Sequence, residues 1–95
     1  MKIEWSRKAL KDREQIFDYL EEQNPRAAVQ TDERIYQQIC KLKDHPRIGR
    51  TGRVSDTYEL VVSETSYIVT YVLLGEVVRV LRILHSSRLW PEEMN

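Results

Sequence analysis

Residues 77–84 read Val-Val-Arg-Val-Leu-Arg-Ile-Leu, and this stretch decides the fold of the chain. Almost every position is a β-former, and apolar residues stand on both faces of the strand that it would form. The stretch therefore predicts a strand in the interior of a sheet. Two runs of alternating apolar residues precede it, over residues 58–62 and 67–73. Turn-forming residues separate the runs at 63–66 and at Gly75, which is typical of strands joined by hairpins.

Towards the N-terminus the pattern changes to helix. Residues 2–5 predict a short first strand, and Ser6 is a suitable N-cap for a helix over residues 7–22. Asn24 and the proline after it interrupt the helical pattern and begin a second helix over residues 25–43, because proline fits the first helical turn. So short a break predicts an antiparallel helical hairpin.

Each helix carries an apolar stripe that we expect to face the sheet. In the first helix the stripe consists of Ala9, Leu10, Ile16, Phe17 and Leu20. The side chains expected to be buried against the sheet include Leu10, Phe17, Ile35 and Ile39. The acids of the first helix are interpreted as its solvated face, namely Asp12, Glu14, Asp18, Glu21 and Glu22.

A loop over residues 45–55 follows, because His45 precedes a proline and leaves the α region. The predicted order is therefore β-α-α-β-β-β, in one α+β domain over residues 1–95. We expect the helical hairpin to pack on one face of a small, mostly antiparallel sheet. The other face would be partly open and could carry a site.

Length and composition limit the class of protein. Ninety-five residues suit one domain, and 41% apolar with 32% charged residues indicates a folded chain. Cys40 is the only cysteine, so a disulfide within the chain is excluded. No apolar run approaches the roughly 18 residues of a membrane span, and no signal peptide is recognisable, so we expect a cytoplasmic protein without membrane contact. His45 and His85 stand apart from any Cys pair or carboxylate cluster, so we expect neither a metal site nor a cofactor.

The net charge is zero, but the cations are unevenly placed. Residues 45–55 and residues 77–91 each hold three arginines and no acid. Because the planar guanidinium suits phosphates and carboxylates, one interpretation is a basic face hidden by the neutral total. The other is a set of ordinary surface pairs with Glu59, Glu64 or Glu76.

Two segments are candidate sites. Residues 46–53 space three arginines with two glycines, so the backbone could approach a phosphate chain; the alternative is a basic crossover loop. Further on, His85 could act as general acid or base, Arg88 could stabilise negative charge, and Trp90 could stack on a base. The alternative is structural, with His85 capping the strand and Trp90 docking the tail.

Taken in order, these segments resemble the RelE/ParE toxin superfamily over essentially the whole chain. The matching pieces are Trp5-Ser6, Ala27-Ala28, residues 46–54, residues 59–62, residues 67–71, and residues 80–85 with Arg88 and Trp90-Pro91. The resemblance implies the same fold and a toxin of a type II toxin–antitoxin module, acting as a monomer or a homodimer. It also implies an antitoxin partner that wraps and silences the toxin, and through which the complex binds operator DNA.

The superfamily's targets divide. RelE-like members cleave mRNA on the ribosome without a metal, whereas ParE-like members inhibit DNA gyrase. The arginine–glycine loop and the tail from His85 to Trp90 are more similar to the ParE-like and StbE-like branches, and of the two functions we favour ParE-like inhibition of gyrase by binding. Target contacts would then include Arg47, Arg50, Arg53, Arg82 and Trp90.

Two alternatives remain open. One is a metal-independent mRNA endonuclease, with His85 and Arg88 as its catalytic residues. The other is a degenerate homologue that only binds its antitoxin. The chain also departs from the pattern at Tyr58, where many relatives have arginine, so the role of that arginine would be lost or moved here.

Overall fold

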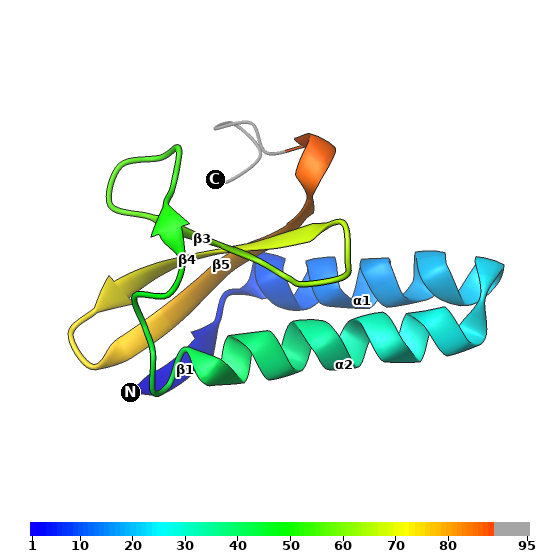
Figure 1. Ribbon diagram of the computed structural model, residues 1–95, viewed down its shortest axis with the longest axis horizontal. Helices are drawn as coiled ribbons and strands as arrows, with labels where there is room; N and C mark the ends of the chain where they lie inside the picture. Colours follow the sequence, from blue (N-terminus) through cyan, green and yellow to red (C-terminus); the bar gives the residue numbers. More distant parts are fainter. Residues whose placement is uncertain (89–95) are drawn as a thin grey trace.

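The structure is a computed structural model and describes residues 1–88 (Figure 1). In chain order its elements are β1 (Lys2–Trp5), α1 (Arg7–Gln23), α2 (Pro25–Lys41), β2 (Arg50–Thr51), β3 (Tyr58–Val61), β4 (Tyr67–Leu74), β5 (Val77–His85) and the 3-10 turn η1 (Ser86–Arg88). The two helices lie side by side beneath the sheet and run antiparallel (Figure 1). The predicted α+β fold, with its helical hairpin on one face, is confirmed.

The sheet has the strand order β1-β5-β4-β3-β2. β1 runs parallel to β5 and the other neighbours are antiparallel, so the sheet is mostly antiparallel as predicted. β5 has a neighbour on both sides, which agrees with its two apolar faces. The two-residue strand β2 lies inside the predicted loop over residues 45–55. There Arg50 and Thr51 pair with Glu59 and Tyr58 at the edge of the sheet.

The hydrophobic core lies between the helical hairpin and the sheet. From α2, Ile35 and Ile39 are both 1% exposed, as their spacing predicts. The sheet contributes fully buried side chains from β4 and β5, which are Val69, Tyr71, Val78 and Val80.

α1 buries only part of its predicted apolar stripe in this core. Leu10 is 52% exposed, so its predicted burial is wrong, and Phe17 is only half-buried beside it. Ala9 and Ile16, which belong to the same predicted stripe, pack against the core as expected. The inward face of α1 therefore comprises the Ala9 and Ile16 side of the predicted stripe together with Asp12.

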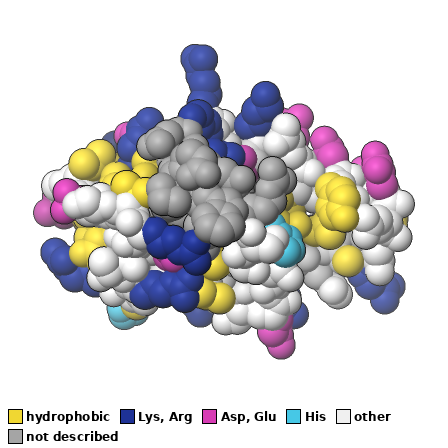
Figure 2. Space-filling view, turned by 90° about the horizontal axis from the view of Figure 1, so that it is seen from above, with side chains coloured by type: hydrophobic (Ala, Val, Ile, Leu, Met, Phe, Trp, Pro, Cys, Tyr) yellow, Lys and Arg dark blue, Asp and Glu magenta, His cyan; other side chains and the backbone are white. Residues whose placement is uncertain are grey.

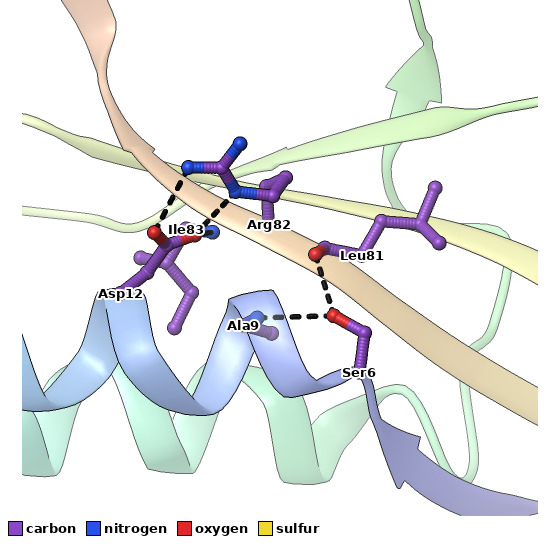
Figure 3. Close-up of polar contacts among 6 residues, drawn as sticks. All are labelled: Ser6, Ala9, Asp12, Leu81, Arg82 and Ile83. Carbon is purple, nitrogen blue, oxygen red and sulfur yellow. Dashed lines mark hydrogen bonds and ion pairs between the residues drawn. The ribbon is translucent and has the colours of Figure 1, made fainter. Parts of the chain in front are cut away.

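Asp12 is 8% exposed, so its assignment to the solvated face is also wrong. Its carboxylate accepts hydrogen bonds from Arg82 Nε at 2.7 Å and Nη2 at 3.0 Å, and from the Ile83 backbone N–H at 3.0 Å (Figure 3). The pairing of β1 with β5 ends at Val80, so this N–H belongs to the part of β5 that extends beyond β1. A side chain of α1 thus supplies the acceptor there.

Both helices begin at the predicted caps. Ser6 Oγ accepts from the Ala9 N–H at 3.0 Å and donates to Leu81 O at 2.7 Å, so the cap of α1 is also tied to β5 (Figure 3). Asn24 Oδ1 accepts from the Ala27 N–H at 3.2 Å at the start of α2. Within residues 1–88, neither helix is long and apolar enough to cross a membrane.

Candidate target-binding site

The arginine loop, residues 46–53, follows α2 and includes the short strand β2 at the sheet edge. The hydroxyl of the fully buried Tyr71 reaches this loop from β4. It donates a hydrogen bond to Pro46 O at 2.8 Å and accepts one from the Gly49 N–H at 3.0 Å. A Cβ atom at position 49 would lie 2.6 Å from the Tyr71 hydroxyl, so glycine is needed for this close approach. Burial raises the pKa of Tyr71, which keeps the phenol protonated and able to donate.

Glu59 fixes the second half of the arginine loop from β3. Its side chain is 2% exposed, and its Oε1 accepts from Arg50 Nε at 3.2 Å and Nη2 at 3.0 Å. Its Oε2 accepts from the Arg53 backbone N–H at 3.1 Å. Of the two interpretations of the arginines, Arg50 thus follows the second, because it forms an ion pair with Glu59.

Tyr58 connects the arginine loop to Tyr71. The two rings are stacked, with centroids 5.3 Å apart and planes at 17°. Arg47 Nη1 donates to the Tyr58 hydroxyl at 3.1 Å. The residue that stands where many relatives have arginine thus contacts an arginine supplied by the loop.

His85 is exposed at the end of β5, as its position in the sequence predicts. Its Nδ1 lies 2.8 Å from Ser87 Oγ and accepts from the Ser87 N–H at 3.3 Å. Its ring also meets the edge of Tyr67, with centroids 5.6 Å apart. Arg88 belongs to the turn η1, and Trp90 lies outside the described residues.

Arg82 stands three positions before His85 on β5, and its ion pair with Asp12 turns its side chain towards α1 (Figure 3). The Arg82 side chain is 19% exposed. Asp12 and Arg82 line an open hollow of about 690 Å³ between α1 and the end of β5, together with Tyr19, Tyr67 and His85.

The two candidate segments meet the sheet at different points along β4. Tyr71, beneath the arginine loop, pairs with Tyr58, whereas Tyr67 pairs with His85. Four residues of a strand span about 13 Å. Figure 2 shows a group of Lys and Arg side chains on one face next to the residues drawn in grey, with a histidine side chain across from it and hydrophobic side chains exposed on both sides.

This arrangement offers two candidate contact regions on one molecule. Arg50 and Arg82 each share their charge with a carboxylate, so both are held in place and partly neutralised. Among residues 1–88, no three His, Cys, Asp or Glu side chains gather closely enough to hold a metal ion. The described geometry suits recognition of a surface by placed hydrogen-bond donors.

The roles of Tyr71 and Asp12 were not predicted from the sequence, and Glu59 was expected there only as a possible surface partner of an arginine. Tyr71 and Glu59 fix the arginine loop, and Asp12 fixes Arg82. The signal available for Glu59 was its position as a lone acid in an apolar strand that follows three arginines.

Comparison with known proteins identifies the family to which the chain belongs. Residues 3–90 match the family model described as ParE toxin of type II toxin-antitoxin system, parDE. A Sinorhizobium fredii protein named "Putative toxin Y4kP" is 33% identical over 91 residues, covering 96% of this chain and 94% of that protein. A chain from a structure titled "Chromosomal ParDE TA system from P. aeruginosa" has the same fold. Its TM-score is 0.82 at 24% identity, covering 90% of this chain and 95% of that one.

The fold and the full-length matches therefore define a small α+β toxin of the RelE/ParE superfamily. Within it, this chain belongs to the ParE toxin family of type II toxin–antitoxin systems.

Proposed function

We propose that this toxin arrests growth by binding DNA gyrase and inhibiting it, until an antitoxin covers the toxin. The observation that carries the proposal is the ParE family match, because it spans residues 3–90 and so includes both candidate contact regions. The target contacts are the arginines of the loop at one region, and Arg82, His85 and the residues after β5, Trp90 among them, at the other.

The charge pairing supports a binding role. A nuclease needs cations aimed at the charge that develops on the phosphate. Here Glu59 holds Arg50 and Asp12 holds Arg82. Arginines held by carboxylates are well placed to make directed hydrogen bonds to a protein surface.

The direct test is a supercoiling assay with purified gyrase and the full chain. We expect dose-dependent loss of supercoiling or trapped DNA-cleavage complexes, and restoration by the cognate antitoxin. Full gyrase activity at a large molar excess of toxin that still arrests growth would rule out the proposal.

A second candidate function is RelE-like cleavage of mRNA on the ribosome. It is favoured by one observation, the exposed His85 at the end of a rigid strand. Primer extension on mRNA from a translating extract tests it. New codon-positioned 5′ ends that vanish with His85→Ala would support the nuclease. If induction of the chain causes no growth arrest at all, a degenerate homologue that only binds its antitoxin is the better description.

A further inference from the structure

The hydroxyl group of Tyr71 has no packing task in the core. A phenylalanine at this position would fill the same buried space and keep the ring stacked on Tyr58. A buried hydroxyl is costly unless its hydrogen bonds are made. Both hydrogen bonds of this hydroxyl go to the backbone of the arginine loop, at Pro46 and Gly49.

The other backbone hydrogen bonds of the loop lie near its ends, from Ile48 N–H to His45 O at 3.3 Å and from Gly52 N–H to Thr57 O at 2.8 Å. The loop contains two glycines, which carry a large conformational entropy, and only Arg50 and Thr51 pair in the sheet. Tyr71 fixes its first half and Glu59 fixes its second half. Fixing a recognition loop before binding removes part of the ordering cost of the complex.

We propose that Tyr71 is a positioning residue for target recognition, because its hydroxyl holds the arginine loop in the shape that the target binds. This inference rests on the proposed role of the loop as a target contact. Tyr71 itself is buried and touches no target. It acts through the backbone at Gly49, and through Tyr58 on the side chain of Arg47.

The main test compares the wild-type chain with Tyr71→Phe, made as full chains by cell-free synthesis. The first readout is the hydrogen exchange of the Gly49 amide together with tryptic cleavage after Arg47 and Arg50. We expect both rates to rise at least tenfold. Cleavage after Arg79, inside β5, reports global unfolding and should change much less. The second readout is the toxin concentration that halves gyrase supercoiling, which we expect to rise at least tenfold.

Two further variants keep the test decisive. Tyr36→Phe is the matched control, because it removes a phenolic hydroxyl from the outward face of α2. It should match wild type in every readout. Gly49→Ala is the second probe, because it retains Tyr71 but places a Cβ atom against the hydroxyl. It should release the loop and weaken inhibition as Tyr71→Phe does, even if Tyr71→Phe folds poorly.

The outcomes separate this inference from the proposed function. A loop released by either variant with inhibition unchanged would overturn the positioning role, and so would a loop that neither variant releases. If the wild-type chain leaves gyrase fully active, the proposed function fails. The positioning role is then decided by growth arrest, which wild type and Tyr36→Phe should cause and Tyr71→Phe and Gly49→Ala should lose.

Discussion

Asp12 joins α1 to β5 through three hydrogen bonds that converge on one carboxylate. Two come from the guanidinium of Arg82 and one from the backbone of Ile83. Removing one partner of a part-buried pair leaves the other charge without compensation, and here it also leaves a backbone N–H without its acceptor. This residue therefore supports the end of β5 that carries His85.

We predict that Asp12→Ala lowers the free energy of unfolding by about 3 kcal/mol, as is typical when one partner of a buried ion pair is removed. Urea unfolding followed by circular dichroism measures the change. Asp18→Ala is the matched control, since Asp18 is an exposed acid of the same helix and should change stability by less than about 0.5 kcal/mol. Equal effects of the two substitutions would contradict the assignment.

Tyr71 gives the fold a dependence on alkaline pH. Burial raises its pKa above the ordinary 10.0, so the folded chain keeps a proton that the unfolded chain releases. Its contribution is fully present below pH 10 and is lost as the pH rises through the folded-state pKa. The free energy of unfolding should fall by up to about 1.4 kcal/mol per pH unit above pH 10 for this one group.

Urea unfolding between pH 8 and pH 11 tests this dependence. Tyr71→Phe should make the decline shallower but not abolish it, because burial also raises the pKa of Tyr67. An alkaline decline in Tyr71→Phe that superimposes on that of wild type would show that Tyr71 is not responsible.

The two helices illustrate why a local pattern predicts one element better than another. The apolar stripe of α2 is read correctly from sequence, because Ile35 and Ile39 are buried for their own apolar surface. α1 buries a carboxylate, and its partner Arg82 lies 70 residues further along the chain. No spacing rule within α1 reveals that pairing, so Leu10 was assigned to the wrong face.

This difference between the helices predicts opposite outcomes for similar truncations. Ile39→Ala should lower the free energy of unfolding by about 2–5 kcal/mol, because it leaves a cavity beneath the sheet. Leu10→Ala removes a side chain that is 52% exposed and should cost less than about 1 kcal/mol. Chemical denaturation of both variants decides the point. A larger loss for Leu10→Ala would mean that α1 packs in the orientation predicted from sequence.

The segments of the candidate site stand out in the sequence, but the contacts within them do not. The arginine loop and His85 stand out in the sequence through residue type and position. The bonds that shape the loop join positions 22 and 25 residues apart, from Tyr71 to Gly49 and to Pro46. Such contacts arise only once β4 has brought the phenol beneath the loop.

At the scale of the whole chain, two arginine variants of equal net charge distinguish a local contact of an arginine from an effect of overall charge. Arg47→Ala and Arg34→Ala each remove one positive charge, so both variants have the same net charge of −1 (0 − 1). Arg47 lies on the arginine loop and bonds Tyr58, whereas Arg34 lies on α2 and pairs with Glu64. Any effect of net charge must appear equally in both.

We predict that Arg47→Ala weakens gyrase inhibition about tenfold, equivalent to about 1.4 kcal/mol, while Arg34→Ala stays within about twofold of wild type. Neither substitution should change stability by more than about 1 kcal/mol, since exposed polar and ionic contacts contribute little. Inhibition curves for the three chains at one salt concentration, with unfolding curves beside them, measure both quantities. Equal weakening by the two variants would indicate that recognition follows overall charge. The proposal that the arginine loop is the contact surface would then be wrong.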